Sequence, residues 1–221
     1  MFPFLTIFII LLIAMAIRFR QLDKKQEAKE EAFWSRELEA SATLAKDISN
    51  LPYITIPLDK FPLNFSEDED IISIEQELSE LSTHKLLNLT GKTNTDLKLE
   101  YGVPNFETMK QIGDDYDRVT VLLNTYGKVL MANERFDDAI RVLEFAVGTN
   151  TDVSETYVLL AACYFATGKD DKLLYLKEHV EKMDTLMKAS ILAHIEEITN
   201  PPEQDSTDTD ETAGTADTED F

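Results

Sequence analysis

The feature that most constrains the fold is a match of the chain with itself at an offset of 34 residues. Between residues 120 and 183, Leu123 falls on Tyr157, and the small residue Gly127 falls on Ala161. Each unit has two amphipathic segments of about a dozen residues joined by a short polar turn, a pattern typical of stacked helical hairpins. The sequence therefore predicts an all-α solenoid, and the low content of glycine and proline, seven of each, favours helices too.

The order of small and large residues in these units resembles the tetratricopeptide repeat. The resemblance implies that small residues lie where the two helices of a hairpin approach, while large ones fill the space between hairpins. Four positions depart from the family pattern: Thr151 replaces a closing proline, Glu134 a turn glycine, Leu173 a small residue and Lys177 a large apolar one. The packing positions it assigns are Leu123, Tyr126, Gly127, Leu130, Ala139, Leu143, Ala146, Tyr157, Leu160, Ala161, Tyr164, Leu173 and Val180.

The same resemblance implies a groove for a protein partner along the first helix of each hairpin. The groove positions would be Val121, Asn124, Lys128, Met131, Glu155, Val158, Ala162, Phe165 and, on the last helix, Leu192. This surface is mixed and fairly apolar, and it lacks the Lys/Arg clamp of the family members that bind chaperones. An acidic C-terminal peptide is therefore not the expected ligand, and the sequence does not name the partner.

Helices on both sides should cap the repeats, because two units rarely bury enough surface alone. Residues 66–104 are predicted to supply a helix over 66–88, opened by a capping box of Ser66 and Glu69, and a loop over 91–104. The repeat domain then covers 105–199, with a last helix over 185–198.

An apolar segment with three prolines precedes these helices, at residues 51–65. Prolines at 52, 57 and 62 forbid a helix, yet the segment is too apolar for a solvated linker. We name it the proline strip and expect it to lie extended on the helical domain, in the groove or on its flank.

The N-terminal residues 2–17 form an apolar run without a charge. As a helix it would span roughly 24 Å, slightly less than a bilayer core of about 30 Å, which snorkelling Arg18 and Arg20 would extend. A signal peptide would have bases before the run and a small-x-small cleavage site after it, and neither is present. The sequence thus predicts an uncleaved transmembrane anchor over 1–20. Its basic residues follow the run, which predicts that the C-terminal domain is cytoplasmic.

Residues 21–50 are predicted to continue as a helical stalk, since Glu, Lys, Ala, Arg and Leu dominate up to Ile48. Its apolar positions follow helical spacing, and Trp34, the single tryptophan, is expected to pack against the domain.

The net charge of −21 is concentrated partly at the other end of the chain. Residues 203–221 hold eight acids and no Lys or Arg, which leaves −13 on the rest. Residues 200–221 are therefore predicted to be a solvated, disordered acidic tail. The acidic balance also argues against nucleic-acid binding, which needs clustered bases.

No catalytic motif is found. His84, His179 and His194 share no metal-ligand spacing with Cys163 or with one another, and His194 is expected to be a core residue. There is no phosphate loop, dinucleotide fingerprint or nucleophile elbow. We expect no catalytic residue, metal, cofactor or small-molecule substrate.

These patterns predict a membrane-tethered adaptor or scaffold that binds a protein partner and performs no catalysis. Two alternatives stay open. One is an extracytoplasmic accessory subunit of a secretion or envelope-assembly machine, and the other is a regulator switched by release of the proline strip.

Overall fold

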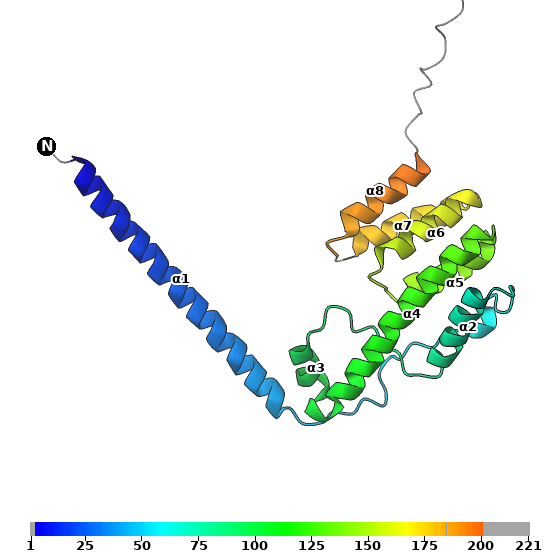
Figure 1. Ribbon diagram of the computed structural model, residues 1–221, viewed down its shortest axis with the longest axis horizontal. Helices are drawn as coiled ribbons and strands as arrows, with labels where there is room; N and C mark the ends of the chain where they lie inside the picture. The colour runs from blue at the N-terminus through cyan, green and yellow to red at the C-terminus, as the bar shows by residue number, and fades with distance from the viewer. Residues whose placement is uncertain (1–2, 184, 201–221) are drawn as a thin grey trace, which may run out of the picture.

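The computed structural model describes residues 3–183 and 185–200, and in these the chain is all-helical, as predicted. Figure 1 shows one long helix that projects away from a packed group of shorter ones. The elements are α1 (Pro3–Ala42), η1 (Leu58–Lys60), α2 (Glu69–Leu81), α3 (Asn94–Tyr101), η2 (Val103–Asn105), α4 (Phe106–Ala132), α5 (Phe136–Gly148), α6 (Ser154–Ala166), α7 (Asp170–Lys182) and α8 (Lys188–Thr199). The predicted acidic tail, apart from Asn200, lies outside the described residues.

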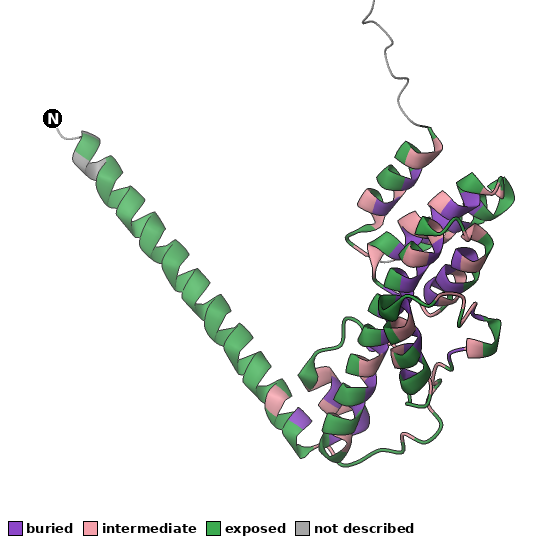
Figure 2. Cartoon of the chain, turned by 45° about the vertical axis from the view of Figure 1, so that its right-hand side comes forward, coloured by how far each residue is buried: buried purple, intermediate pink, exposed green. Residues whose placement is uncertain are grey.

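The first half of α1 packs against no other element that the structure describes. Its large apolar side chains from Ile7 to Phe19 are all about half exposed, and Figure 2 shows exposure along nearly the whole helix. No helix within residues 3–183 and 185–200 combines the length and apolar character required to cross a bilayer. The described helices therefore do not support the predicted transmembrane anchor.

The helical stalk ends at Ala42, earlier than the predicted Ile48. The chain leaves the helix to pair with the end of α3: Val103 N donates to Thr43 O at 3.1 Å, and Lys46 N donates to Tyr101 O at 3.1 Å. The two segments meet at Gly102, where φ is +89° and a Cβ atom would lie 2.1 Å from the backbone oxygen of Leu44.

The expected packing of Trp34 is wrong, because this side chain is 66% exposed. Contact with α3 comes instead from Glu37, which accepts hydrogen bonds from Lys98 and Thr95 at 2.7 Å each, and one turn farther along Ala40 is fully buried. A helix turns 100° per residue, so Ala40 points roughly 120° away from Trp34. The domain thus binds another face of α1.

Helix α3 was not predicted, since residues 91–104 were expected to form a loop. Thr93 and Asp96 form a capping box that starts this helix. Tyr101 from α3 and Met109 from α4 are buried together in a small apolar core.

The capping box predicted for Ser66 and Glu69 is wrong, because Asp68 caps α2 by accepting from Asp70 N. Helix α2 ends at Leu81, earlier than the predicted residue 88.

Two helical hairpins, α4–α5 and α6–α7, follow, and their turns repeat at the 34-residue offset. Arg135 N donates to Leu130 O at 2.9 Å, and Lys169 N donates to Tyr164 O at the same distance. Both turns contain a residue with positive φ: Glu134 at 58° and Gly168 at 65°. The hairpins therefore share one turn geometry.

All thirteen predicted packing positions of the hairpins are buried. At the closest approach of α4 and α5, a Cβ atom on Gly127 would lie 2.6 Å from Leu143 Cδ2. Lys177 is half buried on α7, and its Nζ lies 2.9 Å from Glu196 Oε2 on α8. This ion pair accounts for a lysine at a position where the repeat usually has an apolar residue.

Helices α2 and α8 lie at the two ends of the hairpins, with α2 against α4 and α8 against α6 and α7.

The expectation that His194 is a core residue is wrong. Ile191 and Ile195 take the buried positions of α8, while His194 is exposed and its Nδ1 lies 2.7 Å from Ser190 O.

The shared turn geometry yields a stability prediction. A non-glycine residue in the left-handed region costs about 1 kcal/mol, so Glu134→Gly should stabilise the fold by roughly that amount. The matched change at the equivalent position, Gly168→Ala, should destabilise it by a similar amount. Chemical denaturation of both variants checks this. The account of these turns is wrong if Glu134→Gly unfolds more easily than the parent chain.

Candidate partner-binding surfaces

The predicted groove residues do not share one environment. Val121 on α4 and Phe165 on α6 are 49% and 48% exposed. Met131, Val158, Ala162 and Leu192 are half buried, Lys128 and Glu155 are exposed, and Asn124 is buried. The structure thus leaves apolar surface free on α4 and α6.

Three of the predicted groove residues bind one another. Glu155 Oε2 accepts from Asn124 Nδ2 at 2.7 Å and lies 2.6 Å from Lys128 Nζ. The hydrogen bond from Lys128, followed by that from Asn124, holds the pKa of the Glu155 carboxyl below its usual value. Buried Thr156 donates to Asn124 Oδ1 at 3.3 Å. This network joins α4 to α6, so these side chains stabilise hairpin stacking before they meet any ligand.

The proline strip is an integral part of the main apolar core. Ile56 and Phe61 are 5% and 7% exposed, and the Phe61 ring packs edge-on against Phe145 of α5 with 5.7 Å between ring centroids. At its start, Ile54 N donates to Leu86 O at 2.8 Å. The strip is therefore fixed by both apolar and backbone contacts.

Tyr126 joins the proline strip to the hairpins. Its hydroxyl group lies 2.9 Å from Pro62 O and 2.8 Å from Glu75 Oε1 on α2, and Asn64 N donates to Glu75 Oε2 at 2.8 Å. Burial and the adjacent Glu75 carboxylate raise the pKa of Tyr126. These partners lie on α2, α4 and α5, and Phe165 stays half exposed, so the strip does not fill the predicted groove.

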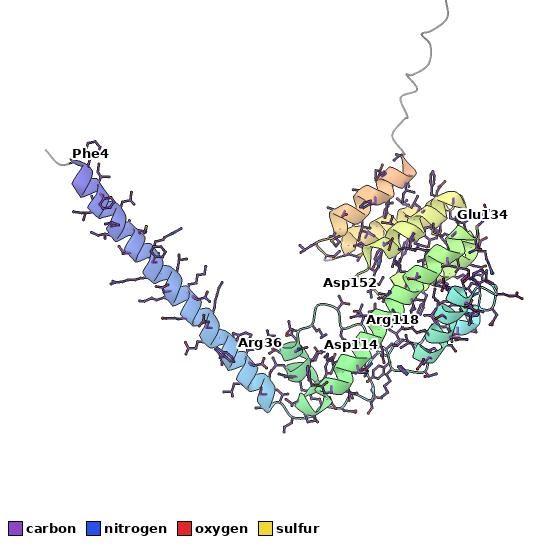
Figure 3. All side chains as sticks on the ribbon, in the orientation of Figure 1. Phe4, Arg36, Asp114, Arg118, Glu134 and Asp152 are labelled. Carbon is purple, nitrogen blue, oxygen red and sulfur yellow. The ribbon has the colours of Figure 1, made fainter. Side chains whose placement is uncertain are left out.

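A cavity of about 460 Å³ lies where the 89–94 segment, the first half of α4 and the start of α6 meet. Asp114, Asp117 and Asp152 line it together with Lys92, Lys110 and the apolar residues Leu89, Leu97, Val121 and Val153. Partial burial, followed by the charges of Asp152 and Asp114, raises the pKa of Asp117. Figure 3 shows Asp114 and Asp152 on the side of α4 that carries α3 and α6. The sequence did not predict this cavity.

A second and more apolar cavity, of about 470 Å³, lies between α5 and α7. Leu160, Tyr164, Tyr175 and Leu176 contribute to its wall, and Tyr175 is 72% exposed. His179 also lines it and has a buried Nε2 atom without a hydrogen-bond partner in the described residues. Tyr175, a large side chain outside the predicted packing positions, is the sequence signal that could have indicated this surface.

Within the described ranges, no three His, Cys, Asp or Glu side chains come together as metal ligands. Cys163 is buried, and burial raises the pKa of its thiol to about 11, which disfavours the reactive thiolate. Cys163 is therefore poorly suited to act as a nucleophile.

The contacts of the proline strip predict a large effect of one substitution. Phe61→Ala removes a buried ring from the main core and should destabilise the domain by about 3–5 kcal/mol. The neighbouring change Lys60→Ala, at an exposed position, should change stability by less than about 0.5 kcal/mol. Chemical denaturation followed by circular dichroism measures both. Equal stabilities of the two variants would show that the strip is not part of the core.

Comparison of the chain with protein-family models, with curated proteins and with solved structures finds no match. The resemblance to tetratricopeptide repeats thus depends on the pattern of residues in this sequence.

Proposed function

We propose that the chain is a membrane-tethered adaptor, which binds a protein partner through its tetratricopeptide-like helical domain and performs no catalysis. The observation that carries this proposal is the exposed apolar surface of α1 between Ile7 and Phe19. A surface of this kind is unfavourable in water, where burying it gains about 25 cal/mol per Å². Lipid is the environment that removes it from water along the full circumference of the helix.

The rest of α1 separates this apolar end from the domain. From Arg20 to Ala42 the helix rises about 33 Å, and its first contacts with α3 come only near Arg36 and Glu37. A domain held at this distance meets partners that are themselves at the membrane, and tethering raises their effective concentration. The basic residues after the apolar run favour the cytoplasmic side.

The exposed apolar side chains Val121 and Phe165 support a partner surface on α4 and α6. The regulator alternative is less favoured, because release of the proline strip would expose Ile56 and Phe61, both part of the main core. The other alternative, an accessory subunit of a secretion or envelope-assembly machine, places the domain on the extracytoplasmic side of the membrane.

Partner capture tests the binding surface. Phe165→Asp introduces a charge at a half-exposed position and should abolish co-purification of the partner from solubilised membranes without lowering the melting temperature. Leu174→Asp is the matched control, since Leu174 is 60% exposed on α7. The proposed surface is excluded if the partner stays bound to the Phe165→Asp variant, or if it is lost equally from the Leu174→Asp variant.

Protease treatment tests the tether and its orientation. The full chain should sediment with membranes and resist protease in intact cells, and the domain should be digested once the cells are opened. A chain found only in the soluble fraction would refute the tether, while digestion in intact cells would favour the extracytoplasmic alternative.

A further inference from the structure

A band of basic side chains follows the apolar part of α1 directly. Arg18, Arg20, Lys24 and Lys25 are all exposed and lie within eight residues of Ile17. Each residue advances an α-helix by 1.5 Å, so Lys25 lies about 12 Å beyond Ile17 along the axis. Side chains of an α-helix lean toward its N-terminus, which brings these four closer to the apolar segment. We call residues 18–25 the basic band.

None of these four bases forms an ion pair within the described residues, although bases of the domain, such as Lys98 with Glu37 and Arg118 with Glu77, do so. Asp23 is the one acid of the band, which leaves it clearly positive. The whole chain carries −21. A strongly acidic protein therefore presents unpaired positive charge at the boundary of its apolar segment.

We propose that the basic band binds the headgroups of anionic phospholipids. The inference rests on the proposed function, because it requires the apolar end of α1 to lie in a bilayer. Each Lys or Arg close to an anionic lipid surface strengthens binding about fivefold at low salt. The attraction offsets the repulsion between that surface and the acidic domain, and it fixes the depth at which α1 leaves the lipid.

The screening length limits which bases take part. It is about 8–10 Å at moderate salt, so charges much farther than this from the headgroups contribute little. Lys29 is exposed like the others but lies about 18 Å beyond Ile17. Lys29 therefore serves as a control: it carries a positive charge but lies too far from the headgroups to contribute to binding.

The single tryptophan gives a direct readout. Trp34 is exposed on α1, about 25 Å beyond Ile17, within reach of energy transfer to dansyl-labelled lipid. The full chain is mixed with phosphatidylcholine vesicles that contain a minority of phosphatidylglycerol, and flotation measures its attachment. Transfer is then compared for dansyl-labelled phosphatidylglycerol and dansyl-labelled phosphatidylcholine at equal mole fraction.

We expect the chain to float with pure phosphatidylcholine vesicles and, in the mixed vesicles, to show a preference of about fivefold or more for the anionic label. High salt should remove most of this preference, the double change Lys24→Gln with Lys25→Gln should lower it, and Lys29→Gln should leave it unchanged. If the chain floats but energy transfer from Trp34 to the two labels is equal, the basic band does not bind anionic headgroups, and the tether stands. The same conclusion follows if Lys29→Gln lowers the preference as much as the double variant does. Failure to float with either vesicle would overturn the tether and the band together.

Discussion

The stability of the fold depends on burying the apolar side chains of helix α4. This helix of 27 residues carries buried side chains along its whole length, from Met109 in the small core to Leu130 in the main one. It is covered by α3 near its start and by α2, α5 and α6 farther along. Tyr126 is an example, because its buried hydroxyl group lies between two acceptors to which it can donate its proton, Pro62 O and the Glu75 carboxylate. The coverage of α4 determines which of its apolar side chains stay exposed.

The proline strip helps to determine which surfaces of the domain are covered and which stay exposed. It packs with α2 and α5 on one side of α4, while the Asn124–Glu155 hydrogen bond joins α4 to α6 elsewhere. Val121 and Phe165 consequently stay exposed although the fold has an apolar peptide segment of its own. The domain thus has one set of apolar side chains that stabilises its own core and another that stays exposed, which is the division that the proposed adaptor role requires.

The periodic part of the fold could be predicted from the sequence, and the aperiodic part could not. The 34-residue offset identifies both hairpins, their turns and all thirteen buried packing positions, because stacking fixes a small or large residue at each of them. Helix α3 was not predicted because its eight residues have little amphipathic pattern, and its only sequence signal is the capping box of Thr93 and Asp96. Trp34 and His194 were misplaced because helical spacing shows that a face is apolar but not which neighbour covers it. The side of α4 bound by the proline strip depends on tertiary contacts such as Phe61 with Phe145, which have no local signal.

Hydrogen exchange of the full chain in lipid tests most directly whether the proline strip is a permanent part of the core. The account predicts that the amides of Ile54 and Asn64, which donate to Leu86 O and to Glu75, exchange as slowly as those in the middle of α4. Exchange of these amides at the rate of an unstructured segment, while α4 stays protected, would contradict it. The strip would then be a releasable segment, and the main core would have to be complete without it.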